Sequence, residues 1–221
     1  MIASFRGFFL ALLACSWGAG SFAGTTAGPV EDEIAALQQE FDAASFQTTD
    51  RGERKASFQA LLEHAAGLRA RYPARAEAVA WDGIVLSTYA GEVGGMGALK
   101  YAKAARDALI EAERLDPAAL DGGVYATLGA LYSKVPGGLI GFGDDEAAER
   151  YFNKALEIDG ASIDNNYFYG EFLLEQGKYA QAVDVLRRAL AAPAVESRPM
   201  FDAARRAEIR SLLETAERKA G

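Results

Sequence analysis

The chain has 221 residues, of which 50% are hydrophobic and 24% charged, and its formal net charge is −8. An acidic surface repels the phosphates of nucleic acids and anionic lipid head groups, so neither is expected as a partner. Half of the residues are apolar over a chain of this length, which is enough for one sizeable core and predicts a single domain.

Residues 1–23 have the pattern of a secretory signal peptide. Arg6 supplies a positive start, Gly7–Trp17 is apolar, and small residues lead to an expected cleavage after Ala23. This predicts a periplasmic or secreted mature chain. The alternative is a lipoprotein, because the four residues that end in Cys15 resemble a lipobox. The apolar run falls short of the ~20 residues that a bilayer-spanning helix needs.

Cleavage would remove both Arg6 and the single cysteine, Cys15. The mature chain would then keep 22 Lys and Arg against 31 Asp and Glu, a net charge of −9. Neither a disulfide nor a cysteine–metal site could form in it, so its stability is expected to come from burial of apolar surface.

Apolar residues beyond Pro29 recur at helical rather than alternating spacing, as Ile34, Leu37, Phe41 and Ala44 illustrate. Residues 24–72 are expected to form an N-terminal helix pair, a degenerate version of the units that follow. No segment has the alternation of a strand, so the fold is predicted to be all-α.

A repeat is visible in the middle of the chain. Its first-helix pattern is Tyr125-x-x-Leu128-Gly129-x-x-Tyr132, and its second-helix pattern is Ala148-x3-Phe152-x2-Ala155. The second-helix pattern returns at Ala182, 34 residues after Ala148. Small residues such as Gly83, Gly129 and Gly170 should let two helices approach closely. The large residues Leu109, Phe152 and Leu186 are expected to fill the gap to the next pair.

These patterns resemble the tetratricopeptide repeat (TPR) superfamily over about three quarters of the chain. The resemblance implies a right-handed α-α superhelix of three to four helix pairs, with the TPR-like repeats in residues 73–194. Residues 195–221 should form a C-terminal capping helix, because Ile209, Leu212 and Ala216 lie on one face.

The glycine-rich segment Pro136–Asp145 is similar to a turn in TatT, the periplasmic TPR component associated with TRAP transporters. That resemblance implies a helical protein with a cleft or pore, which assists a solute-binding protein in delivering an apolar or organic-acid ligand. The partner would be another envelope protein. The alternative, based on the repeats alone, is a generic scaffold for assembly of cell-envelope complexes.

The candidate binding residues lie in two places. Gly91–Gly97 and Pro136–Gly143 belong to insertions at the same turn of neighbouring units and are expected to form one apolar rim for a ligand or partner. An alternative is that their side chains only pack the edge of the array. The rim residues are Val93, Met96, Leu139, Ile140 and Phe142, and a second set, Asn165, Asn166 and Tyr169, is expected to line the concave groove.

Catalytic and metal-binding patterns are not found. The single histidine, His64, has no partner for a catalytic or metal constellation, and Asp144 and Asp145 are expected to cap a helix. Asp159 and Asp164 lack the ligand spacing of a calcium loop. The sequence therefore predicts a non-enzymatic binding module without a cofactor or metal, and it leaves paired-carboxylate chemistry and oligomerisation open.

Overall fold

The computed structural model describes residues 28–221, which form nine α-helices, one 3-10 helix and no strand. The predicted all-α class is confirmed. The expectations for the signal segment, cleavage after Ala23 and acylation at Cys15, lie outside the described residues.

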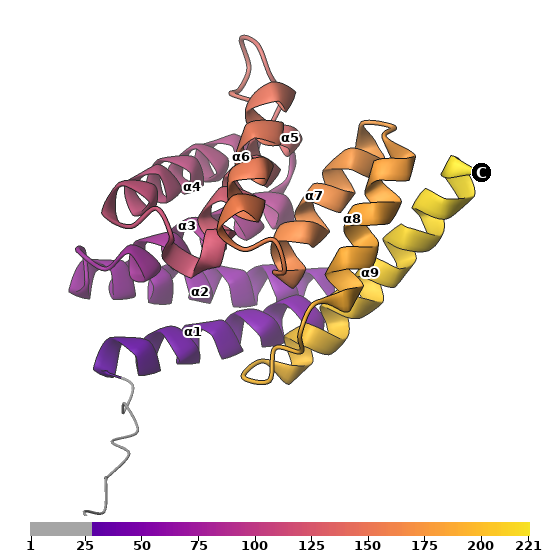
Figure 1. Cartoon of the computed structure of the whole chain (residues 1–221). Coiled ribbons are helices and arrows are strands. Elements are labelled where there is room, and N and C mark those ends of the chain that lie inside the picture. The colour runs from indigo at the N-terminus through magenta and orange to yellow at the C-terminus, as the bar shows by residue number, and fades with distance from the viewer. Residues whose placement is uncertain (1–27) are drawn as a thin grey trace, which may run out of the picture.

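The helices follow one another as four antiparallel pairs and a final single helix (Figure 1). Within the chain they are α1 (Pro29–Phe46), α2 (Arg51–Arg71), α3 (Ala76–Val93), α4 (Gly95–Leu115), α5 (Gly123–Lys134), α6 (Asp145–Ile158), α7 (Ile163–Glu175), α8 (Tyr179–Ala191) and α9 (Pro199–Ala220). The 3-10 helix η1 (Ala119–Gly122) connects α4 to α5. The expected fourth pair is present as α1 and α2.

Glycines let the two helices of a pair approach closely, as predicted. The large residues that were expected to fill the gap to the next pair lie against these glycines within their own pair. A Cβ atom added to Gly83 would lie 2.7 Å from Leu109, one on Gly129 would lie 2.8 Å from the Phe152 ring, and one on Gly170 would lie 2.6 Å from Leu186. Any side chain larger than hydrogen would force the facing residue or its helix to shift. The same contact therefore recurs in the second, third and fourth pairs.

Side chains also fix the predicted helix starts. Asp144 Oδ1 accepts a hydrogen bond from the Ala147 amide at 2.9 Å, which confirms its capping role. Asp145 is the first residue of α6, where a carboxylate complements the helix dipole. Ser162 caps α7 in the same manner, through the Asn165 amide.

The structure corrects the expectation that Gly91–Gly97 is an inserted loop. The extra residues of this unit instead lengthen its two helices, since α3 has 18 residues and α4 has 21. The chain reverses at Gly94 and Gly95, whose positive φ values of 64° and 55° suit glycine. In Pro136–Gly143, by contrast, the extra residues do form a loop, which projects beyond α5 and α6 in Figure 1.

The last helix, α9, has two roles in the packing. Ile209 and Ala216 are fully buried in a cluster with residues of α7 and α8, so α9 caps the array as predicted. It also contacts α1, so the first and last helices of the described chain meet, although the C-terminal end of α9 lies away from α1 (Figure 1). No helix within residues 28–221 is both long and apolar enough to cross a membrane.

Candidate functional site

A cavity of about 990 Å³ lies on the inner side of the array. Its walls come from the first helix of every pair, α1, α3, α5 and α7, with contributions from α2 and η1. The residues of α9 and of the 192–198 segment line its remaining side. Because α9 joins α7 and α8 to α1, the concave groove of the array becomes a partly enclosed site.

Aromatic rings form one wall of the cavity. Phe41 packs edge-on against Trp81 and against Phe58, with ring centroids 5.5 Å apart in both pairs. Phe168 and Phe201 face the same space from α7 and α9. This wall offers apolar ring surface to whatever occupies the cavity.

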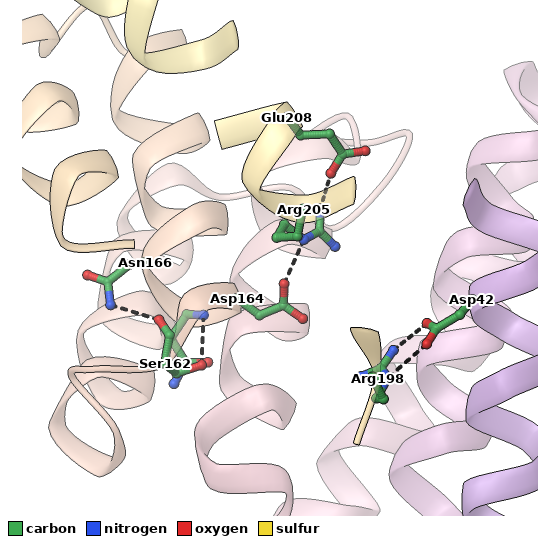
Figure 2. Close-up of polar contacts among 8 residues, drawn as sticks. Asp42, Ser162, Asp164, Asn166, Arg198, Arg205 and Glu208 are labelled. Atoms are coloured by element: carbon green, nitrogen blue, oxygen red, sulfur yellow. Dashed lines mark hydrogen bonds and ion pairs between the residues drawn. The ribbon is translucent and has the colours of Figure 1, made fainter. Parts of the chain in front are cut away.

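An ion pair joins α1 to the residue that precedes α9, as Figure 2 shows. Arg198 donates from Nε to Asp42 Oδ2 at 3.0 Å and from Nη2 to Asp42 Oδ1 at 2.5 Å. The Asp42 side chain is 5% exposed. The Arg198 guanidinium also lies over the Phe201 ring at 4.2 Å. A two-pronged pair of this kind fixes orientation as well as distance, so it holds α1 against the start of α9.

Arg205 on α9 is the most enclosed cation of the site. Its Nε lies 2.7 Å from Asp164 Oδ1 and its Nη1 lies 2.6 Å from Glu208 Oε2, and the guanidinium sits 4.0 Å from the Tyr167 ring centre. Burial by itself would lower the pKa of Arg205, but the neighbouring acidic groups outweigh it and raise the pKa above its ordinary value. Burial also raises the pKa of Tyr167 to about 12, which keeps that phenol neutral.

Asn165 at the start of α7 has an amide whose orientation is set by its neighbours. Nδ2 donates to the backbone carbonyls of Asp121, Ala155 and Asp159 at 3.0–3.1 Å. Since all three partners are acceptors, the nitrogen must face them, and Oδ1 must face away. Within residues 28–221, Oδ1 is buried and has no hydrogen-bond partner.

The backbone next to Asn165 is in an unusual conformation. Leu120 and Asp121 have φ values of 56° and 51°, and both residues line the cavity. Such left-handed geometry is uncommon for residues with a side chain and persists only where surrounding contacts fix it. Here the Asp121 carbonyl is held by Asn165, and a Cβ on Gly122 would lie 3.0 Å from the Asn165 amide nitrogen.

Of the eight binding residues predicted from the sequence, Asn165 alone lines this cavity. Asn166 was expected in the groove, and this is corrected: its side chain is fully buried and binds the carbonyls of Gly160 and Ser162. Tyr169 is half-buried and packs on Phe152, outside the cavity.

The predicted rim residues have different surroundings. Phe142 is half-buried, 5.2 Å from the Tyr132 ring and 4.6 Å from the Arg106 guanidinium, so it anchors its loop. Leu139 and Ile140 are exposed, as is Met96 at the start of α4. Val93 is half-buried beside the N-terminal core cluster. A binding role for the exposed members stays a prediction.

Sequence reasoning missed most of the cavity. The lining residues that were not predicted include Trp81, Asp121, Asp159, Arg198 and Arg205. Trp81 could have been found from the sequence, because it lies on the first helix of its pair and first helices line the concave face of a TPR array. Nothing local marks the two arginines, because their partners Asp42 and Asp164 are distant in sequence.

His64 has one polar neighbour, Glu40, with Nδ1 2.9 Å from Oε2, on a partly exposed surface between α1 and α2. Among residues 28–221 no three His, Cys, Asp or Glu side chains gather in a way that could hold a metal ion.

The paired helices and the groove on their inner side define an all-α array of the tetratricopeptide type. The family model described as tetratricopeptide repeat matches residues 139–199. This range contains the two second helices in which Ala148 and Ala182 are one period apart. The resemblance to the TPR superfamily is therefore confirmed at the level of the fold, while the finer resemblance to TatT stays a prediction.

A solved structure shows the same fold. The chain is similar to a thermophilic TPR protein of Thermus thermophilus, with a TM-score of 0.55 and 20% identity, over 82% of this chain and 91% of that one. A crystal structure of MamA protein gives a TM-score of 0.43 at 15% identity, over 85% of this chain and 92% of that one. No curated protein sequence matches the chain.

Proposed function

We propose that this protein is a non-enzymatic, exported binding module that holds a ligand in its cavity as an accessory of an envelope transport system. The observation that carries the proposal is the cavity of about 990 Å³ between the first helices and α9. Ligand pockets typically measure about 300–1,000 Å³ and combine apolar walls with a few fixed polar groups. The aromatic wall, Asn165 and the paired arginines supply that combination.

Export and a partner from a transport system are further parts of this proposal. The apolar run after Arg6 supports export, and the similarity of Pro136–Asp145 to the TatT turn supports a solute-binding protein as partner. The TPR-like fold supports a protein partner in general, because stacked helix pairs offer extended surfaces for one.

Filling the cavity should abolish ligand binding. Thr127 on α5 lines the cavity and is half-buried. In the Thr127→Trp variant the indole would occupy the space of a ligand, so we expect at least a roughly tenfold loss of bound ligand. The measurement is native mass spectrometry of the full chain purified from its own envelope, in which a bound molecule adds its mass.

Ser211→Trp is the matched control, because Ser211 is exposed on α9 and does not line the cavity. It should retain the bound molecule. Equal occupancy in the Thr127→Trp variant, or no bound molecule in the unaltered protein, would contradict a ligand-binding role for the cavity.

A scaffold for envelope complexes is the second candidate, and the Pro136–Gly143 loop favours it. Leu139 and Ile140 have exposed fractions of 107% and 58%, so the loop presents two large apolar side chains to its surroundings. Phe142 holds the loop against α4 and α5, and the Asp144 amide donates to the Tyr132 carbonyl at 2.9 Å. An anchored loop with exposed apolar side chains suits contact with another protein.

Charges in this loop should therefore weaken capture of a protein partner. We expect the Leu139→Asp, Ile140→Asp double variant to lose a partner cross-linked in envelope extract, about tenfold or more, with little change in stability because both side chains are exposed. Ile158→Asp, at another exposed apolar side chain, is the control. Unchanged capture by the double variant would rule out the loop as the contact surface.

A further inference from the structure

Unsatisfied buried polar atoms are concentrated at the cavity. Within residues 28–221, six buried side-chain nitrogen or oxygen atoms lack a well-formed hydrogen bond, and all six belong to residues that line it. Two of them, Asp164 Oδ1 and Arg205 Nε, face each other in the ion pair described above. The remaining four are Ser45 Oγ, Arg54 Nε, Trp81 Nε1 and Asn165 Oδ1. An unpaired buried polar atom costs roughly 1–3 kcal/mol, so a concentration of them on one cavity indicates a polar occupant.

The charges of the lining indicate the sign of that occupant. Its three arginines already have carboxylate partners: Arg54 pairs with Glu92, Arg198 with Asp42, and Arg205 with Asp164 and Glu208. These pairs leave no uncompensated positive charge for an anion.

Three lining carboxylates, Asp121, Asp159 and Glu196, have no basic partner within the described residues 28–221. The backbone carbonyls of Asp121 and Asp159 both accept from Asn165 Nδ2, so these two residues adjoin the same amide. The Asp159 carboxylate accepts one backbone hydrogen bond, from Ala161 at 2.8 Å. We call Asp121, Asp159 and Asn165 the acidic pole. It offers acceptors only, which is what a protonated amine requires.

The rest of the cavity suits the body of an organic cation. Aromatic rings attract cations through their faces. Two arginines make such contacts in this cavity: the Arg198 guanidinium lies 5.7 Å from the Trp81 ring centre, and that of Arg205 lies 5.3 Å from the Phe168 ring centre. Trp81 Nε1 is a buried donor that lacks an acceptor within residues 28–221. An occupant could satisfy it with an oxygen.

We propose that the cavity binds a small organic amine, with its ammonium group at the acidic pole, its apolar body against the aromatic wall, and an oxygen that accepts from Trp81 Nε1. This inference rests on the proposed ligand-binding function and adds the chemical class of the ligand. A small molecule fits better than a chain segment, because α9 and the Asp42–Arg198 pair close the side through which a segment would lie.

Tyramine is a suitable probe, since it carries an ammonium, one ring and one hydroxyl. Its matched analogues are 4-ethylphenol, which lacks the charge, and 3-(4-hydroxyphenyl)propionate, which reverses it. We expect calorimetric titration of the full chain at pH 7 to give binding of tyramine, at least about tenfold weaker binding of 4-ethylphenol, and no binding of the anion. In a Trp17→Phe background Trp81 is the only tryptophan, and its indole N–H signal in NMR should shift with tyramine.

The Asp121→Asn, Asp159→Asn double variant tests the acidic pole. Asparagine tolerates the positive φ of residue 121 and can still accept from the Ala161 amide, so the fold should be kept. Tyramine affinity should fall about tenfold or more. Asp184→Asn on the exposed side of α8 should change it less than about twofold.

Equal affinity for tyramine and the anion, unchanged affinity in the double variant, or no tyramine binding would overturn the amine assignment. The proposed function fails separately. An anionic or neutral molecule found in the native protein and lost in the Thr127→Trp variant would refute the amine but leave ligand binding intact.

Discussion

Replacing Arg198 by alanine should destabilise the protein by about 3–5 kcal/mol, because the Asp42 carboxylate would stay buried without its cation. Asp42 is 4% exposed, and the two hydrogen bonds from Arg198 connect residues 156 positions apart. The same change removes the guanidinium from the Phe201 ring. Urea unfolding at pH 7, followed by circular dichroism, measures the free energy of unfolding.

An exposed ion pair between α8 and α9 gives the control. Arg187 and Glu217 lie 2.8 Å apart, but their side chains are 62% and 45% exposed. Exposed pairs contribute little, so Arg187→Ala should cost less than about 1 kcal/mol. If Arg198→Ala costs no more than this control, the Asp42–Arg198 pair does not hold the start of α9 against α1.

A double variant that removes both charges separates the cost of an unpaired buried charge from the loss of the ion pair itself. Asp42→Leu combined with Arg198→Met removes both charges and should be much less destabilising than Arg198→Ala alone, because no buried charge is left unpaired. The double variant would keep the fold but lose the two-pronged contact that orients α9. Arg198 and Phe201 line the cavity. The same variants therefore also show whether contact between α1 and α9 supports ligand binding.

Local patterns in the sequence predicted the helix pairs because the contacts that define them are local. Gly129 and Phe152 are 23 positions apart and belong to adjacent helices, and the pairs at Gly83 and Gly170 repeat the arrangement. The capping role of Asp144 is likewise set within three residues of α6. A period of 34 residues makes such contacts recur and therefore visible.

The cavity could not be predicted in the same way, because it depends on contacts without a period. Asn165 was predicted to line the groove, but its hydrogen bond to the Asp121 carbonyl, 44 positions earlier, follows from no local pattern. The segment Gly91–Gly97 has the composition of a loop, but helices α3 and α4 extend through most of it. Glycine content alone did not distinguish a tight reversal from an insertion.

Phe152→Ala should be as damaging as loss of Arg198, at about 3–5 kcal/mol, because it leaves a cavity in the core between α5, α6 and α7. Phe152 is 1% exposed, and its ring lies against Gly129 and within 5.3 Å of the Phe172 ring centre. Thermal and urea unfolding both measure the loss. A cost below about 1 kcal/mol would show that neighbouring side chains collapse into the space.

The partner position tests the same contact from the other side. A Cβ atom on Gly129 would meet three atoms of the Phe152 ring at 2.8–2.9 Å, and a ring cannot bend aside, so Gly129→Ala should cost about 1–3 kcal/mol. Gly91→Ala is the control, because a Cβ there meets nothing within 4 Å and alanine favours the helix. It should stabilise the protein slightly.

Combining Gly129→Ala with Phe152→Leu should relieve part of the strain, because a leucine side chain leaves room that the flat ring occupies. We expect the two costs to be non-additive by about 1 kcal/mol or more. Additive costs would mean that the glycine and the ring do not limit how closely α5 and α6 approach. That distance matters for the cavity, because α6 supplies the Ala155 carbonyl that accepts from Asn165 Nδ2 and helps to orient this amide of the acidic pole.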